Sequence, residues 1–251
     1  IGVVPTPEPY AKRSAQGMIL GANGVKMSKS LGNVVDPNDV VDKFGADTLR
    51  TYVLFMGDYG SAAPWNDNSV RGCKRFLDRV VSLTDIASGR GETPELSSAF
   101  HKTVKKVTED IEAMKFNTAI AAMMTLLNDI CDHGSLTLDE LSVFIRILSP
   151  FAPHMVEEMW ELTGEAAKTG TMAMQQPWPE YDESKTVASH VEMAVQVLGK
   201  LKGTINVPVD SEQDFIVETA KQNEKVARAI DGKTIVKVIL VKNKLVNLIV
   251  K

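Results

Sequence analysis

Two lysines and two serines stand close together between glycines in the segment 24–33, as Lys26, Ser28, Lys29 and Ser30. Ammonium groups beside hydroxyl donors suit a polyphosphate, because such donors stabilise the charge that grows as a phosphoanhydride breaks. Glycines allow backbone conformations that other residues resist, so a loop of this kind can also move. The alternative is a solvated basic turn, since short motifs often arise by chance. The spacing does not match a Walker loop, which requires Gly-x-x-x-x-Gly-Lys-Ser/Thr.

Elements on either side must position this segment, which we call the lysine loop. A hairpin is expected just before it, because Met18-Ile19-Leu20 leads into Gly21-Ala22-Asn23-Gly24. After it, Asp36 and Pro37 predict a helix start, with Asp36 as N-cap, and Phe44 and Gly45 predict its end. A second helix is expected over 46–56. Its β-branched and aromatic residues leave a strand as the alternative.

The middle of the chain shows the spacing of several amphipathic helices. A loop is expected over 57–64. The predicted helices then cover 68–87, 95–114, a stretch from about 117, 138–148, and a stretch after Pro153. The first of them carries a basic face, which could equally be a solvated surface: Arg71, Lys74, Arg75 and Arg79. Glu157, Glu158 and Glu161 are also expected on a solvated face, and His154 is expected near a helix start. Short connections between such helices indicate a helical bundle.

The period of the sequence changes near the C-terminus. Apolar residues alternate with polar ones over 191–197 and 205–209, which predicts strands. A helix is expected over 212–230, followed by strands over 234–241 and 244–250 joined by a tight turn. This order predicts a small β-β-α-β-β domain. Lysines gather at its turns, where either edge protection or binding could explain them: Lys200, Lys202, Lys242 and Lys244.

Composition limits the class of protein. The chain has 251 residues, of which 44% are apolar and 24% charged, as in ordinary soluble globular proteins. No apolar run approaches the ~20 residues of a membrane span, and no signal peptide is visible. Cys73 and Cys131 are expected to be buried apolar residues in a reducing compartment. Since the histidines are scattered and the cysteines lack ligand spacing, we expect no metal site.

Charge is distributed unevenly along the chain. Residues 1–91 have a net charge of +2 and residues 189–251 a net charge of +3, whereas residues 92–188 have a net charge of −9. A nucleic acid, if one binds, is therefore expected to contact the two ends of the chain rather than its middle.

The segment Lys26-Met27-Ser28-Lys29-Ser30 resembles, letter for letter, the signature loop of the class I aminoacyl-tRNA synthetases. Further stretches are similar to class Ia members, and several look most like the bacterial leucyl enzymes. These stretches are 16–20, 31–33, 36–37, 45–50, 75–77, 116–120, 150–154, 177–179, 196–200 and 207–209, together with Trp160. The resemblance covers nearly the whole chain. Three positions depart from the leucyl pattern: Ala15, Arg71 and Leu198. The His-Ile-Gly-His-type motif of the family is absent.

The resemblance implies the C-terminal portion of a larger enzyme with a multidomain α+β fold. The implied domains are the end of the catalytic domain with the lysine loop over 1–60, a helical bundle of the anticodon-binding type over 61–165, a linker over 166–188, and a small tRNA-contacting α+β domain over 189–251. The intact enzyme would be a cytoplasmic monomer, with no membrane partner. It would also contain catalytic and editing parts that this chain lacks.

The implied reaction joins leucine to leucine tRNA at the expense of ATP, which Mg²⁺ accompanies. By this resemblance Lys29 would stabilise the leaving pyrophosphate, and Lys26 would hold the active form of the loop or add a second charge. Met27, Ser28 and Ser30 would complete the ATP contact. The alternatives are a detached tRNA-binding or docking module without activity, and the equivalent part of a valyl or isoleucyl enzyme. The chain by itself is expected to be inactive.

Overall fold

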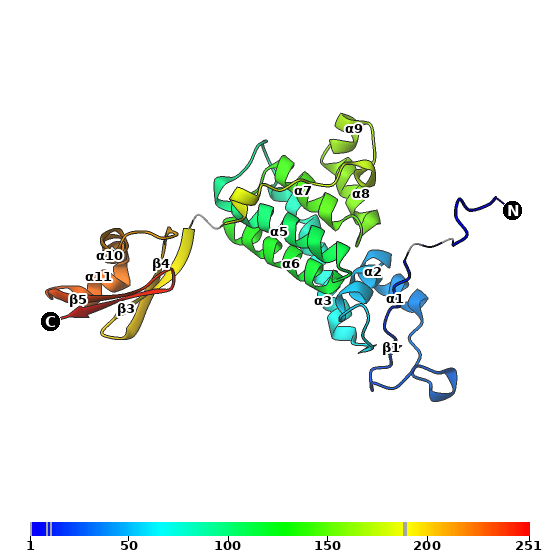
Figure 1. Cartoon of the computed structure of the whole chain (residues 1–251), viewed down its shortest axis with the longest axis horizontal. Helices are drawn as coiled ribbons and strands as arrows, with labels where there is room; N and C mark the ends of the chain where they lie inside the picture. The colour runs from blue at the N-terminus through cyan, green and yellow to red at the C-terminus, as the bar shows by residue number, and fades with distance from the viewer. Residues whose placement is uncertain (1, 9, 11, 188–189) are drawn as a thin grey trace. The chain divides into compact units, whose positions relative to one another are not determined.

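The computed structural model describes residues 2–8, 10, 12–187 and 190–251. The chain divides between residues 182 and 183 into two compact units (Figure 1). The first is mainly helical, and the second combines four strands with two helices. The predicted multidomain α+β fold is therefore confirmed. Within the described ranges, no helix combines the length and apolar character that crossing a membrane would require.

The first unit begins with a small two-stranded arrangement. Strand β1 (Ile19–Leu20) pairs in parallel with β2 (Ala63–Pro64), and Leu20 also forms an antiparallel bridge with Lys26. The predicted hairpin is thus present as a single bridge. A Cβ atom at Gly17 would lie only 1.8 Å from the carbonyl oxygen of Ser61, so only glycine fits this close approach of two backbones.

Two short helices follow the lysine loop. Helix α1 (Pro37–Phe44) begins as predicted, because the Asp36 side chain accepts a hydrogen bond from the Asn38 N–H and Pro37 occupies the first turn. Helix α2 (Ala46–Phe55) follows directly, so the strand alternative for this stretch is wrong. A small core, which we call the platform core, joins these two helices to the helix that follows them, α3 (Asp67–Val81). Its buried residues are Val40, Tyr52, Trp65, Val70 and Cys73.

The helix predicted over 68–87 is in fact two helices, α3 (Asp67–Val81) and α4 (Leu83–Ile86). The break lies at Ser82, whose hydroxyl donates to the carbonyl of Arg79 at 2.8 Å. Thr84 likewise donates to the carbonyl of Val81 at 2.8 Å. Such side-chain bonds to nearby carbonyls compete with the helical ladder, which explains why the periodic pattern alone missed the interruption.

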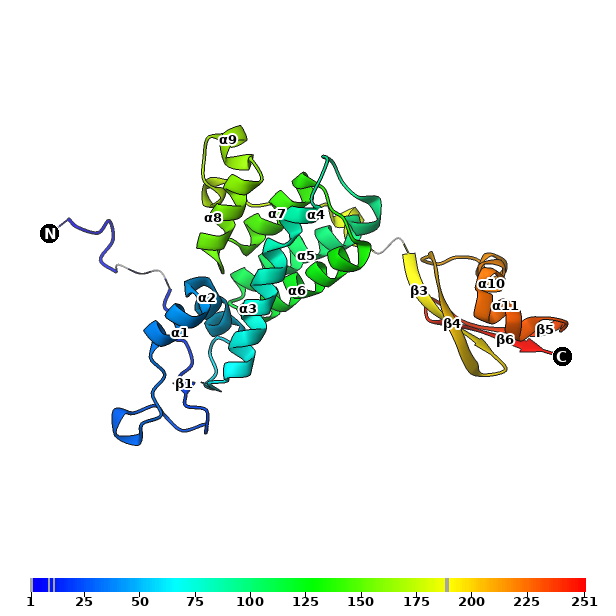
Figure 2. The same cartoon turned by 180° about the vertical axis from the view of Figure 1, so that it is seen from behind.

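The helical bundle contains α5 (Pro94–Glu112), α6 (Phe116–His133), α7 (Leu138–Leu148), α8 (Pro153–Leu162) and α9 (Glu165–Thr169). Helices α5 and α6 lie side by side in both views (Figures 1 and 2). Fully buried apolar side chains, such as Ile120 and Phe144, form one continuous core.

Cys131 is exposed, so the expectation that both cysteines are buried is wrong for it. It occupies the solvent face of α6, where the apolar stripe ends.

The chain continues along the bundle after α9. The indole N–H of Trp160 donates to the carbonyl of Thr171, and Ala173 is buried in the bundle core. Ala173 begins a short 3-10 helix, η2 (Ala173–Gln175), and the Glu157 carboxylate accepts hydrogen bonds from the N–H groups of Ala173 and Met174. Glu157 is therefore not part of a purely solvated face, as its place in the helix pattern had suggested. Its carboxylate satisfies two N–H groups that begin a helix.

The second unit starts with a 3-10 helix, η3 (Glu183–Thr186). Its regular elements are β3 (His190–Val197), β4 (Lys200–Pro208), α10 (Gln213–Gln222), α11 (Glu224–Ile230), β5 (Ile235–Val241) and β6 (Leu245–Val250). The strand order is β4-β3-β6-β5, with β3 and β6 parallel and the other pairs antiparallel. The single helix predicted over 212–230 is broken at Asn223, whose side-chain oxygen accepts from the N–H groups of Lys225 and Val226 and starts α11.

Candidate functional site

The lysine loop is an ordered turn followed by a short helix. The Gly24 N–H donates to the Gly21 carbonyl at 2.8 Å, and Gly24 has a φ of 75°, which glycine adopts without strain. Ser28 then caps the 3-10 helix η1 (Lys29–Leu31), since its hydroxyl oxygen accepts from the Leu31 N–H at 3.2 Å. The Ser28 and Ser30 hydroxyl oxygens lie 3.1 Å apart. Both serines therefore help to shape the loop, and Ser28 is half-buried.

Asn33 joins the two ends of this helix. Its side-chain oxygen accepts from the Ser28 N–H at 2.8 Å, and its amide donates to the Lys26 carbonyl at 3.3 Å. The same amide lies against Gly21, where an added Cβ atom would be 2.8 Å from its nitrogen. Sequence reasoning placed Asn33 at the end of the motif but missed this role. An asparagine shortly after a glycine-bounded turn, able to donate and accept at once, was the signal that could have found it.

Met27 attaches the loop to the platform core. Its side chain is partly buried and packs against the platform core. Leu49 of α2 and Val35 are likewise partly buried against this core. A flexible apolar side chain suits this role because it fills an irregular gap without fixing one conformation. Met27 thus separates the two lysines and holds the backbone between them.

Lys26 and Lys29 are both exposed. No carboxylate among the described residues lies within ion-pair distance of either ammonium group. Lys29 is the first residue of η1, and Lys26 bridges to Leu20 through its backbone. The structure therefore brings together all five predicted residues of the motif. It leaves the two cations unneutralised and at the surface, where an anion could reach them.

The four predicted lysines of the second unit fall into two separate pairs. Lys200 starts β4 opposite Val197, at one end of the sheet, and Lys202 follows on the same strand. Lys242 and Lys244 lie within the turn before β6, on either side of Asn243. Because β4 runs antiparallel and β6 parallel to β3, these two strands start at opposite ends of the sheet. The four lysines therefore do not form one patch.

Tertiary structure adds two lysines to the first pair. The backbones of Thr234 and Lys251 bond to each other at 2.9 and 3.0 Å, beyond the pairing of Ile235 with Val250. This register places Lys233 and Lys251 at the end of the sheet that holds Lys200. Strand register, which the sequence alone does not give, was needed to find them.

At the other end of the sheet, Lys242 lies 3.1 Å from the Asp210 carboxylate. Hydrogen bonds from Asn243 and Lys242 lower the pKa of Asp210.

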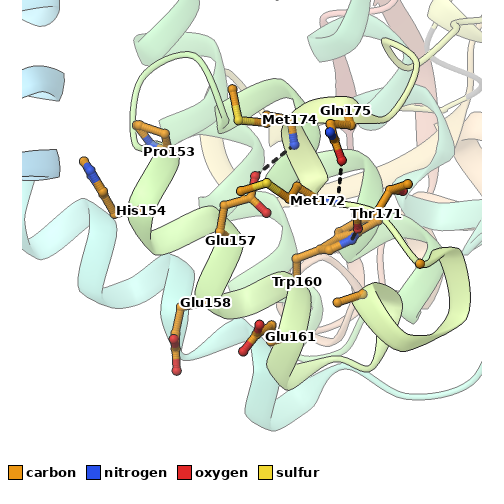
Figure 3. A pocket seen from close by; sticks show the side chains of 12 residues that line it. Pro153, His154, Glu157, Glu158, Trp160, Glu161, Thr171, Met172, Met174 and Gln175 are labelled. Carbon is orange, nitrogen blue, oxygen red and sulfur yellow. Dashed lines mark hydrogen bonds between the residues drawn. The ribbon is translucent and has the colours of Figure 1, made fainter.

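An open groove of about 810 Å³ lies between α8 and the segment 170–175 (Figure 3). Glu157, Glu158 and Glu161 line it, with Trp160 at its base and Met174 at its rim. Three carboxylates in one groove oppose a phosphate ligand, so this hollow is a poor candidate for nucleotide or RNA binding. Within the described ranges, no group of three or more His, Cys, Asp or Glu side chains is arranged to hold a metal ion.

Comparison with known proteins gives consistent matches. The family described as tRNA synthetases class I (I, L, M and V) matches residues 4–66, and the family described as the anticodon-binding domain of tRNA ligase matches residues 94–217. A leucine–tRNA ligase of Alkaliphilus oremlandii (strain OhILAs) is 48% identical over the whole chain, which spans 31% of that protein. A solved ternary complex of an Agrobacterium radiobacter LeuRS with tRNA and LeuAMS is 32% identical, with a TM-score of 0.65. The chain is covered completely in that comparison and spans 34% of the solved protein.

Proposed function

We propose that this chain, which belongs to the leucyl-tRNA synthetases of class I, works as the C-terminal portion of an enzyme that activates leucine with ATP and transfers it to leucine tRNA. The chain spans about a third of the length of these relatives, so the activity belongs to the intact protein. The 48% identity over the whole chain favours the leucyl enzymes over the valyl and isoleucyl ones. The catalytic share of this chain is the lysine loop.

The observation that carries this proposal is the pair of exposed, unneutralised lysines of the loop, with Lys29 at the start of the short capped helix and Lys26 just before it. Lys29 contacts the triphosphate and stabilises the charge that develops on pyrophosphate as the adenylate forms. Lys26, which precedes the helix and whose carbonyl accepts a hydrogen bond from the Asn33 amide, adds a second positive charge. Ser28 and Ser30 can each reorient a hydroxyl toward phosphate, while Met27 anchors the loop. Donors that strengthen in the transition state raise the rate of the chemical step.

Lys29→Ala in the intact enzyme tests this role. We expect the rate of leucine-dependent ATP–pyrophosphate exchange to fall by roughly 10²-fold, the scale of one lost transition-state donor. The matched control is Lys43→Ala, which removes an exposed lysine of α1 outside the loop and should leave the exchange rate within about twofold. An unchanged exchange rate in Lys29→Ala, with normal folding, would refute the role.

The basic second unit is proposed to contact leucine tRNA through phosphate and shape rather than through base pairs. The support is its net charge of +3 and the gathering of Lys200, Lys233 and Lys251 at one end of the sheet. Binding of this chain to leucine tRNA and to an unrelated tRNA, each at two salt concentrations, tests it. Preferential, salt-weakened binding of leucine tRNA supports the proposal. It should weaken more in Lys200→Glu than in Lys242→Glu, because Lys242 already has an acidic partner.

Equal or absent binding of the two tRNAs would favour the alternative, in which the chain alone is a folding and docking unit. Recognition would then require the rest of the enzyme. The exchange experiment with Lys29→Ala stays informative in that case, because adenylate formation can be measured without tRNA.

A further inference from the structure

Asp47 links two helices that lie far apart in the sequence. Its side chain is only 11% exposed, and both carboxylate oxygens contact the start of α8. One oxygen lies 2.8 Å from Nδ1 of His154, and the other accepts from the Met155 N–H at 2.7 Å. Asp47 itself belongs to the first turn of α2. The contact therefore joins positions that are 107 and 108 residues apart in the chain.

Helix α8 lacks a side-chain cap of its own. Its N-cap position is Ala152, whose side chain offers no hydrogen-bond acceptor, and Pro153 follows. The N–H groups of the first turn of a helix need partners from elsewhere, and a carboxylate near a helix N-terminus is also favoured by the helix dipole. Asp47 meets both needs from another helix. This arrangement ties the orientation of α2 to the orientation of α8.

The same helix α2 also forms the wall against which the lysine loop is anchored. Tyr52 of α2 is fully buried in the platform core, and Leu49 and Met27 pack against that core. Phe55, at the end of α2, packs against both the platform core and the bundle core. Arg50 adds a second polar link, since its guanidinium donates to the Pro150 carbonyl at 3.3 Å. Helix α2 is thus shared by the loop and the bundle.

We propose that Asp47 is a positioning residue for adenylate formation. It fixes α2 against the start of α8, and through the packing of Met27 on the platform core it sets where Lys29 lies relative to the helical bundle. This inference rests on the phosphate role proposed above for Lys29. Asp47 touches neither ATP nor leucine in this scheme. It acts only by placing the lysine, and small misplacements of a catalytic group are costly to rate.

The test measures pyrophosphate exchange in the intact enzyme with Asp47→Ala, Lys29→Ala and the double variant. Asp47→Ala should lower kcat by roughly tenfold while changing the KM for ATP less than about twofold, because the misplaced lysine is missed mainly in the transition state. In an enzyme that already carries Lys29→Ala, adding Asp47→Ala should cause no further fall in kcat. Such non-additivity is the signature of two residues acting through one another.

Asp47→Asn should recover most of the rate. Its amide oxygen can accept from the Met155 N–H, and its amide nitrogen can donate to a neutral His154 ring. Asp42→Ala, which removes an exposed carboxylate from α1, is the matched control and should leave the rate unchanged. If Asp47→Ala does not fold, His154→Ala removes one of the two contacts at an exposed side chain, and a loss of kcat of roughly two- to threefold is expected, again only when Lys29 is present.

Additive losses from Asp47→Ala and Lys29→Ala would overturn the inference, because a purely structural defect acts whether or not Lys29 is present. Wild-type kcat in Asp47→Ala would overturn it as well. If Lys29→Ala alone had no effect, the phosphate role would fail first, and this outcome is distinguishable from the other two.

Discussion

In the helical bundle, side chains such as Ile120 and Phe144 are fully buried, whereas the short helix η1 of the lysine loop contains no buried residue. The bundle derives its stability from apolar area removed from water. The loop is held instead by a few hydrogen bonds around Asn33 and by one partly buried apolar side chain, Met27. Segments with few apolar contacts open at low free-energy cost. A loop that must close over a substrate and reopen is drawn from such segments.

The comparison shows how a site with few apolar contacts of its own can still be accurately placed. The platform core and helix α2 lie between the two regions, and Phe55 belongs to the surroundings of both cores. The bundle therefore fixes the base of the loop through α2, while the loop itself is held mainly by hydrogen bonds. Substitutions should separate these two properties.

The largest effect is expected in the bundle. Phe144→Ala removes a fully buried ring from α7 and should lower the free energy of unfolding of the first unit by about 3–5 kcal/mol, because it loses apolar burial and leaves a cavity. Urea unfolding followed by circular dichroism measures this. The control in the loop is Leu31→Ala. Because Leu31 is 62% exposed, this substitution should change the free energy of unfolding by less than about 0.5 kcal/mol. Similar losses at both positions would contradict this division between bundle and loop.

A smaller effect, dependent on pH, is expected in the platform core. Burial raises the pKa of the Cys73 thiol from 9.0 to about 11. The folded state thus favours the neutral thiol. The contribution of this thiol to the free energy of unfolding is complete below pH 9 and is lost as the pH rises through 11. The loss is about 2 kcal/mol.

Unfolding experiments at about pH 8.5 and pH 11 on the parent chain and on Cys73→Ala test this expectation. The parent should lose about 2 kcal/mol more than the variant between the two pH values, since only the parent carries the thiol. Thiol labelling at about pH 8 provides an independent check. Exposed Cys131 should react at once, while buried Cys73 should stay protected until the platform core opens. Equal labelling rates would show that this core is looser than the bundle.

The smallest effect is expected within the loop itself. Asn33→Ala removes two hydrogen bonds, one to Ser28 and one to Lys26. Their loss should lower the free energy of local opening of the loop by about 1 kcal/mol net. Protection of the Ser28 amide from hydrogen exchange should fall by roughly fivefold, with no change in the global unfolding transition. Asn38→Ala, in which an exposed amide of α1 is removed, is the control. A lowered global transition in Asn33→Ala would mean that the loop is part of the cooperative unit.

Local sequence chemistry specifies much of the site. The turn of the lysine loop, the Asp36–Pro37 start of α1 and the strand-strand-helical-strand-strand order of the second unit all depend on neighbouring residues. Turns, caps and strand alternation depend on contacts within a few positions, so they can be predicted directly from the order of residues. The helix breaks at Ser82 and Asn223 are local too, but their hydrogen bonds compete with an otherwise continuous periodic pattern.

How these parts meet depends on tertiary packing instead. Three features join positions distant in sequence: the contact of Asp47 with the start of α8, the backbone approach of Ser61 to Gly17, and the placement of Lys251 at the end of the sheet where β4 starts. No local periodicity encodes such contacts, because they depend on strand register and on which helix faces pack together. The order of residues thus established which side chains could stabilise a phosphate. Packing of Met27 and α2 on the platform core established where those side chains are held.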